Sequence, residues 1–238
     1  IVNININKKK NKIHVTPKLE KINETVAIDS AANAVVQKWQ GIAEKNYASL
    51  GFDAKKVLIA NGEPLDGRES EIRSHPTNLT KIIVSSIADA VPNAHVVLMN
   101  SGSIRVDDIL QMPLTEYDVL RTLPFGGGIR EADMKGSLLI KTLEQGKENI
   151  GIGGYLVYNE NLVNANDKWL LNNVPIDPSK TYHVAITDFL LTGKEANLDD
   201  LNPTNVDVVK GYEAATSITD PRSDVSLAVV KYLKKQKK

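Results

Sequence analysis

The sequence contains no cysteine, which excludes disulfide bonds, thiolate metal sites and thiol-based catalysis. It also has no net charge, because 29 lysines and arginines balance 29 aspartates and glutamates. A neutral chain has no overall field that attracts nucleic acid or a membrane surface, so any anion binding has to be local. No apolar run approaches the roughly 20 residues that a transmembrane helix needs. We therefore expect neither a nucleic-acid partner nor a membrane span.

Motifs for metal binding and for nucleophilic catalysis are also missing. None of the four histidines lies at metal-ligand spacing from another: His14, His75, His95 and His183. Two of them, His95 and His183, lie in apolar stretches, where a hydrogen-bonded core histidine is expected. The sequence has no Gly-x-Ser-x-Gly elbow, and its glycine-rich turns lack the Walker lysine and the dinucleotide-binding spacing. The sequence thus predicts no metal ligand, no cofactor and no catalytic residue in this segment.

The hydrophobic periodicities predict both strands and helices. Residues Ile1–Ile6 alternate between apolar and polar, as in a half-buried strand. Steps of four and three predict an amphipathic helix that packs on a core, with the apolar residues Ile28, Ala32, Val35, Trp39 and Ile42. Thr77 or Asn78 is placed to cap a second helix, and Thr115 with Asp118 has capping-box spacing. Because strands and helices mix without strict alternation, we expect a mixed sheet.

The central stretch is an apolar run, Val96–Met99, that ends in a polar turn with Asn100, Gly102 and Arg105. Such a run is typical of a strand covered on both faces, and ligands bind beyond the carboxyl ends of strands in open α/β sheets. Asn100 offers an amide, Gly102 allows close backbone approach, and Arg105 offers a planar cation for phosphate or hydroxyl oxygens. Alone, the stretch is equally compatible with a sharp turn and a surface arginine.

Four more residues complete a set suited to recognition rather than to reaction. Arg73 is a second cation for anionic or hydroxyl oxygens, and Glu195 lies in a turn where its carboxylate could accept hydrogen bonds from a vicinal diol. Phe125 and Phe189, two of only three phenylalanines, follow a turn or a strand end. Two facing rings could enclose a flat base at roughly 1–3 kcal/mol per stacked base. For either ring alone, ordinary packing is an equal alternative.

Several of these residues lie in motifs that occur in the order and spacing of one known family. The motifs are Leu65-Asp66-Gly67-Arg68, Thr77-Asn78-Leu79, Asn100-Ser101-Gly102-Ser103-Ile104-Arg105, Leu123-Pro124-Phe125-Gly126 and Thr187-Asp188-Phe189-Leu190. They resemble the C-terminal domain of the 5′-nucleotidases, which include UDP-sugar hydrolases and 2′,3′-cyclic-nucleotide phosphodiesterases. The Asn-x-Gly-x-Ile-Arg and Leu-Pro-Phe-Gly blocks are specific in combination.

The resemblance implies a mixed α and β fold with four layers, α-β-β-α. It implies that residues 22–238 form a substrate-binding domain, and that residues 1–21 are the remnant of, or linker from, a preceding metallophosphoesterase domain. That preceding domain would bind two divalent metal ions and perform the hydrolysis. The ligand implied is a nucleotide or nucleoside, and the location implied is periplasmic, secreted or cell-surface.

The resemblance also assigns roles to individual residues. Phe125 and Phe189 would stack the base, while Arg73, Arg105 and Asn100 would contact sugar and phosphate. The family's acidic turn, Gly-Gly-Asp-Gly, reads Gly193-Lys194-Glu195-Ala196 here, so Glu195 keeps the carboxylate but loses its flexible neighbours. This departure leaves a second hypothesis open, in which the chain is a non-catalytic interaction module that keeps the fold but has lost nucleotide recognition.

Overall fold

The computed structural model describes residues 1–236, and the chain separates into two compact units. Unit 1 is Ile1–Asn46, and unit 2 begins at Tyr47. Among residues 1–236, no helix combines the length and the apolar character that crossing a membrane requires. The assignment of residues 1–21 to a preceding domain and of residues 22–238 to a substrate-binding domain stays a prediction.

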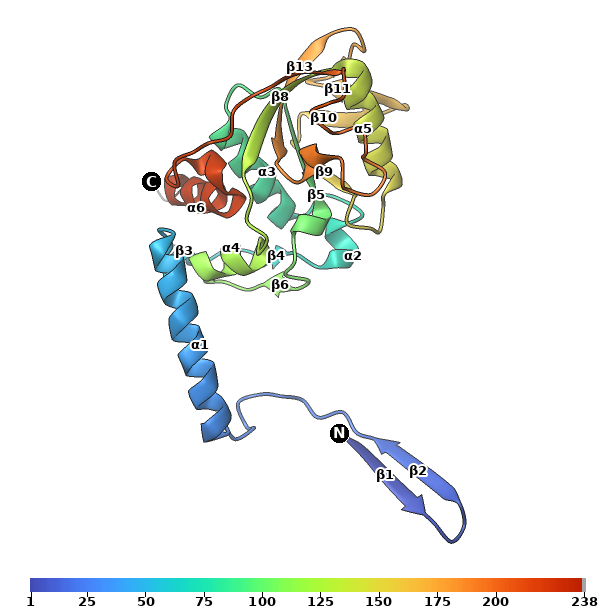
Figure 1. Ribbon diagram of the computed structural model, residues 1–238, viewed down its shortest axis with the longest axis vertical. Helices are drawn as coiled ribbons and strands as arrows, with labels where there is room; N and C mark the ends of the chain where they lie inside the picture. The colour runs from blue at the N-terminus through green and yellow to red at the C-terminus, as the bar shows by residue number, and fades with distance from the viewer. Residues whose placement is uncertain (237–238) are drawn as a thin grey trace. The chain divides into compact units, whose positions relative to one another are not determined.

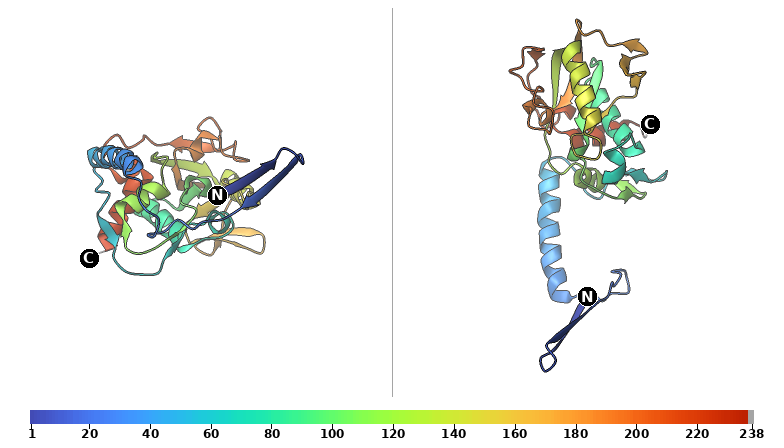
Figure 2. Two further views of the ribbon diagram at one scale, coloured as in Figure 1. Left: turned by 90° about the horizontal axis from the view of Figure 1, so that it is seen from below. Right: turned by 90° about the vertical axis from the view of Figure 1, so that its right-hand side faces the viewer.

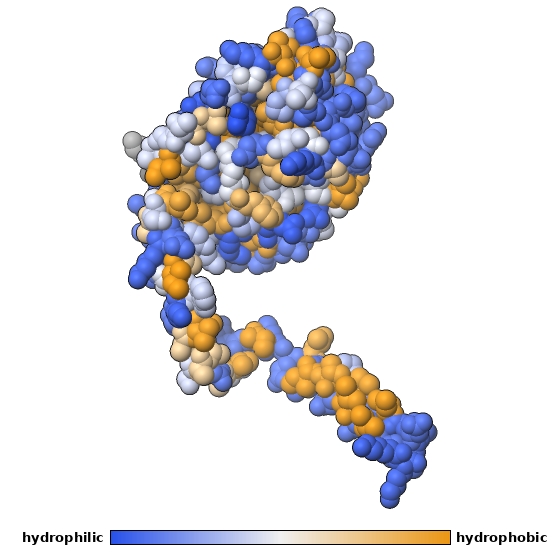
Figure 3. All heavy atoms as spheres, in the orientation of Figure 1, coloured by the Kyte–Doolittle hydropathy of each residue, from blue (hydrophilic) through white to orange (hydrophobic). Residues whose placement is uncertain are grey.

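Unit 1 begins with an antiparallel hairpin of β1 (Val2–Asn7) and β2 (Lys12–Pro17), which confirms the predicted strand (Figure 2). Its register places Ile4 opposite Val15 and Ile6 opposite Ile13, so the apolar side chains share one face. These side chains are exposed rather than half-buried, and apolar atoms gather along the hairpin in Figure 3. Alternation identifies the apolar face of a strand, but burial also requires a second layer, which residues 1–46 do not provide.

The predicted amphipathic helix is α1 (Ser30–Ser49), and it ends just before Gly51, whose φ of 86° is left-handed. Its apolar stripe does not pack on a core, because Val35 and Trp39 are 57% and 61% exposed. The expectation of burial was wrong here for the same reason as in the hairpin. Helical periodicity specifies which side chains share a face and not what covers that face.

The central element of unit 2 is a five-stranded sheet (Figure 1). Its strands, in spatial order, are β14 (Val208–Gly211), β8 (Ile129–Lys135), β13 (Thr181–Thr187), β5 (Val96–Asn100) and β9 (Leu156–Tyr158). The pairing of β13 with β5 is parallel, and the other three pairings are antiparallel. The prediction of a mixed sheet is therefore confirmed.

The remaining elements of unit 2 are helices and small sheets. The helices are α2 (Glu69–Ile72), α3 (Asn78–Ala90), α4 (Glu116–Thr122), α5 (Gly136–Glu148) and α6 (Val225–Gln236), with 3₁₀ turns η1 (Ser101–Ser103), η2 (Leu190–Thr192) and η3 (Pro221–Ser223). Two small sheets pair β3 (Val57–Ile59) with β7 (Leu114–Thr115) and β4 (Leu65–Asp66) with β6 (Ile109–Leu110). A third has three strands in the order β10 (Leu162–Ala165), β11 (Lys168–Leu171) and β12 (Val174–Pro175).

The five-stranded sheet is covered on both faces, so β5 is buried throughout as its apolar run predicted. Val96 and Leu98 point into a core that includes α5, whereas Val97 and Met99 point into a second core with α3 and α6. Helices thus lie on both sides of the sheet (Figure 1). The mixed α and β class is confirmed, and the further strands lie in the small sheets of two or three strands.

Two predicted helix starts are confirmed by their capping contacts. The Thr77 hydroxyl accepts a hydrogen bond from the backbone N–H of Thr80 at the start of α3. At the start of α4, Thr115 and Asp118 form a reciprocal capping box. Each cap satisfies backbone N–H groups that have no partner inside the helix.

His183 is hydrogen-bonded through both ring nitrogens, as expected of a core histidine. Its Nδ1 lies 2.7 Å from the Asp133 carboxylate and its Nε2 lies 2.9 Å from the Glu131 carboxylate. Glu131 also accepts a hydrogen bond at 2.8 Å from Arg222, in the turn that precedes α6. The cluster therefore connects β8, β13 and η3. His95, in contrast, is exposed just before β5, so its prediction as a core residue was wrong.

The contacts of His183 predict a pH-dependent contribution to stability. Burial lowers the pKa of His183, but the hydrogen bonds to Asp133 and Glu131 outweigh this, and the pKa lies above its ordinary value of 6.5. A raised folded-state pKa stabilises the fold fully below pH 6.5, and this stabilisation is lost as the pH rises through the folded pKa. We expect His183→Gln to reduce the free energy of unfolding by about 2 kcal/mol near pH 5.5 and by less near pH 9.

Urea unfolding at the two pH values measures this difference. The matched control is His14→Gln, which removes an exposed histidine from unit 1 and is expected to change stability at neither pH. An equal loss at both pH values for His183→Gln would contradict a charged imidazole.

Candidate functional site

The ends of three strands meet at one edge of the central sheet. Because β5 and β13 are parallel neighbours, their carboxyl ends at Asn100 and Thr187 lie at the same edge. β8 runs antiparallel to β13, and its first residue, Ile129, pairs with Thr187. The loop before β8, which carries Phe125, therefore reaches this edge too. Phe189 follows Thr187 by two residues.

A cavity of about 570 Å³ lies at this edge, a size typical of small-molecule sites. Its lining includes five of the seven predicted site residues: Asn100, Gly102, Phe125, Phe189 and Glu195. Both rings are accessible, at 69% exposed for Phe125 and 44% for Phe189, while the third phenylalanine, Phe52, is buried. The structure thus brings the two predicted rings into the wall of one cavity. Their roles as base-stacking residues stay predictions.

Asp188 connects the two loops that carry the rings. Its carboxylate accepts hydrogen bonds from the backbone N–H of Gly128 at 3.0 Å and of Phe189 at 2.6 Å. Its own backbone N–H donates to the Gly128 carbonyl at 2.9 Å. At Gly127 φ is 97°, and an added Cβ would lie 2.7 Å from the Asp188 carboxylate. Sequence reasoning missed Asp188, although an acidic residue at a strand end beside a glycine-rich turn was a usable signal.

Asn100 is 3% exposed, and both ends of its amide contact other side chains. Its Nδ2 donates to the Glu195 carboxylate at 2.6 Å, and its Oδ1 accepts from the Ser103 hydroxyl at 2.7 Å. Glu195 also accepts from the backbone N–H of Ala196 at 2.9 Å. Asn100 thus orients the Glu195 carboxylate, and both ends of its amide are already hydrogen-bonded within the protein.

Gly102 allows two backbone turns to approach each other in the cavity wall. Its N–H donates to the Gly153 carbonyl at 2.8 Å. A Cβ at Gly102 would lie only 2.9 Å from the Gly153 Cα, closer than atoms in contact can lie. The predicted close approach at Gly102 is therefore present, and it is an approach of backbone to backbone.

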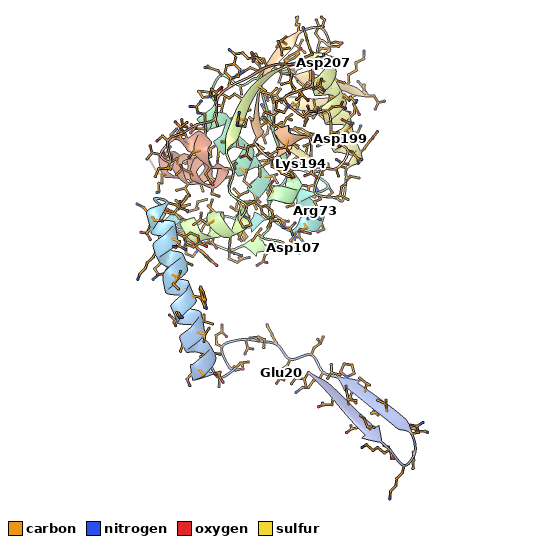
Figure 4. All side chains as sticks on the ribbon, viewed as in Figure 1. Glu20, Arg73, Asp107, Lys194, Asp199 and Asp207 are labelled. Carbon is orange, nitrogen blue, oxygen red and sulfur yellow. The ribbon has the colours of Figure 1, made fainter. Side chains whose placement is uncertain are left out.

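The two predicted arginines lie beside the cavity rather than in its lining. Arg73 accepts a backbone hydrogen bond from Gly151, two residues before Gly153 in the cavity wall. The Arg105 guanidinium lies 5.8 Å from the ring centroid of Phe125. Both guanidinium groups approach one carboxylate that the sequence did not single out, Glu69, at 2.7 Å from Arg73 and 3.7 Å from Arg105. Figure 4 labels Arg73 at the edge of unit 2.

Among residues 1–236, no three histidine, aspartate or glutamate side chains are grouped to hold a metal ion. The cavity lining offers two aromatic rings, hydrogen-bonding groups and the carboxylates of Asp188 and Glu195. The two divalent metals that the resemblance places in a preceding domain stay a prediction.

The fold and the cavity define a ligand-binding domain whose pocket lies at a strand-end edge of a mixed sheet. Residues 56–199, more than half of the chain, match the model of the family described as 5′-nucleotidase, C-terminal domain. The chain therefore belongs to the 5′-nucleotidase family and contains the C-terminal domain of that family.

Similar proteins agree with this assignment. UshA from Yersinia enterocolitica is 32% identical over 143 residues, which cover 58% of this chain and 26% of that protein. A 5′-nucleotidase from Vibrio cholerae is 31% identical over 136 residues, 56% of this chain and 23% of that protein. The structure of a 5′-nucleotidase precursor from Thermus thermophilus shares the fold, with a TM-score of 0.64 and 21% identity over 85% of this chain and 40% of that one. The matched part is thus about a quarter of the length of the two curated relatives.

The contacts of Asp188 predict its contribution to the fold of the cavity wall. We expect Asp188→Ala to lower the free energy of unfolding by about 2 kcal/mol, because two backbone N–H groups lose a charged acceptor. Urea unfolding followed by circular dichroism measures this. The control is Asp200→Ala, which removes a carboxylate whose ion pair with Lys141 is half-exposed, with an expected change below about 0.5 kcal/mol. Equal effects of the two variants would show that Asp188 does not fix the loops.

Proposed function

We propose that this chain binds the nucleoside part of a nucleotide for a 5′-nucleotidase-type hydrolase, which removes phosphate from nucleotides. The observation that carries the proposal is that two accessible rings, Phe125 and Phe189, line one cavity. An aromatic ring left accessible gains most from a flat partner, and each stacked base contributes about 1–3 kcal/mol. The membership of the family supports the choice of a nucleotide as that partner.

The other cavity residues fit the same ligand. The Glu195 carboxylate, oriented by Asn100, can accept hydrogen bonds from ribose hydroxyl groups. Gly102 lies in the cavity lining, where a Cβ would clash with the Gly153 backbone that forms the same wall. Arg73 and Arg105 lie beside the cavity, and their guanidinium groups would suit the oxygens of a phosphate attached to the ribose.

The hydrolysis itself is proposed to occur in the preceding domain. Two divalent metal ions bound there would supply an activated water or hydroxide for attack on phosphorus. Residues 1–21 would be the remnant of that domain or the linker from it, and residues 22–238 would bind the substrate. We place the full-length protein in the periplasm, outside the cell or at the cell surface, as a proposal drawn from the family.

A second candidate is a non-catalytic interaction module that keeps the fold without nucleotide recognition. The observation behind it is the turn Gly193-Lys194-Glu195-Ala196, which departs from the family's acidic turn. The position of Glu195 in the cavity lining and its hydrogen bond from Asn100 favour the first proposal. Ligand binding separates the two.

Calorimetric titration with adenosine tests the proposed function directly. We expect saturable binding with a Kd on the order of micromolar to millimolar. Phe189→Ala is expected to weaken this binding about 10-fold or more, because one stacking surface is lost. The control is Trp39→Ala, which removes an exposed aromatic residue in unit 1 and should leave the Kd unchanged. The absence of binding at millimolar adenosine would favour the interaction module.

The isolated chain is also expected to be catalytically silent. Phosphate release from AMP, measured with Mg²⁺, Mn²⁺ or Zn²⁺ present, should not exceed the rate without protein, because residues 1–236 contain no group of histidine, aspartate and glutamate side chains that could hold the metal ions for such a hydrolysis. The same preparation should bind adenosine, which shows that the domain is folded. Metal-dependent release of phosphate would overturn this expectation.

A further inference from the structure

The Glu69 carboxylate lies close to both Arg73 and Arg105, and the proposed function does not explain this position. Its Oε1 lies 2.7 Å from the Arg73 guanidinium and 3.7 Å from that of Arg105. One carboxylate oxygen thus contacts both cations that are expected to receive a phosphate. The Glu69 side chain is about a third exposed, so it competes for these cations at a position that a ligand can reach.

The position of Glu69 is fixed by the backbone. Glu69 is the first residue of α2, and its N–H donates to the Asp107 carboxylate at 2.9 Å. Arg73 directly follows α2 and, at a spacing of four residues, lies beside Glu69. Asp107, which is labelled in Figure 4, follows Arg105 by two residues. The same loop therefore supplies the second cation and the anchor for Glu69.

The surrounding charges do not compensate for Glu69. Arg68, the third arginine here, forms an ion pair with Asp66 at 2.6 Å and lies 3.9 Å from Glu71. Glu71 also lies 3.6 Å from the ring of His75. Around α2, the three arginines therefore lie among four carboxylates, those of Asp66, Glu69, Glu71 and Asp107, so this group of charges has no positive surplus.

We propose that Glu69 sets the charge preference of this site, disfavouring a doubly charged phosphate monoester relative to a singly charged phosphodiester of the same nucleoside. This inference rests on the proposed function. A dianion near Arg73 and Arg105 meets twice the repulsion from Glu69 that a monoanion meets. Arg73 and Arg105 also attract both charges of a dianion, so Glu69 reduces the preference of the site for a monoester and does not by itself reverse it.

A role in positioning would give the opposite result. If Glu69 served only to orient the two guanidinium groups, its loss would weaken the binding of every phosphate-containing ligand. Glu69→Gln separates the two roles, because the amide retains an oxygen that can accept from Arg73 but carries no charge. The sign of the change in affinity therefore decides between them.

The experiment measures the Kd of adenosine, AMP and the methyl ester of AMP for the 238-residue chain, without divalent metal and at low salt. For Glu69→Gln we expect AMP to bind about fivefold more tightly than to the unmodified chain, the methyl ester about twofold more tightly, and adenosine unchanged. The gain for AMP should shrink at about 0.5 M NaCl, because salt screens exposed charges.

Glu71→Gln is the matched control. It removes the same charge from the same helix, but Glu71 contacts Arg68 and His75 instead of the pair beside the cavity. We expect at most half of the gain in affinity for AMP that Glu69→Gln produces. If Glu69→Gln binds adenosine but binds AMP no more tightly than the unmodified chain does, the proposed role of Glu69 is wrong. The proposed function would not be affected by that result. No saturable binding of adenosine to the unmodified chain would overturn the proposed function, and the role of Glu69 with it.

Discussion

The parallel pairing of β5 with β13 is the constraint on which the cavity depends. The register from Val96 opposite Val184 to Leu98 opposite Ile186 places the two carboxyl ends side by side. The antiparallel neighbour β8 then begins where β13 ends, which brings the loop of Phe125 to the same edge. Asp188 connects the two loops through backbone N–H groups. Residues from three distant parts of the chain thus meet because of strand order and not because of local sequence.

Features that depend on local chemistry were predicted correctly from the sequence. The continuous apolar run of β5 matches a strand covered on both faces, and the caps at Thr77 and Thr115 follow from hydroxyl groups placed before apolar helices. The meeting of Phe125 and Phe189 is different, because periodicity contains no information on strand order. That expectation came from a resemblance to a family, and the structure supplies the physical reason for it.

The predictions that failed were those that depend on how a helix or strand contacts the rest of the protein. The stripe of α1 was correctly identified as apolar, but Trp39 and its neighbours are exposed, because a pattern cannot indicate whether a second layer exists. Glu69 was missed for a related reason. An acidic residue in the first turn of a helix is favoured by the helix dipole alone, so its contact with two arginines leaves no separate signal in the sequence.

The balance of charge in the whole chain is also found among the charged side chains beside the cavity. The chain as a whole is neutral, and the two arginines beside the cavity both lie close to the Glu69 carboxylate. Under the proposed function, a phosphate that binds Arg73 would compete with the existing ion pair to Glu69, so it would add less affinity than binding to an unpaired arginine. Under the proposed function, the arginines would therefore orient the phosphate while the rings provide the affinity.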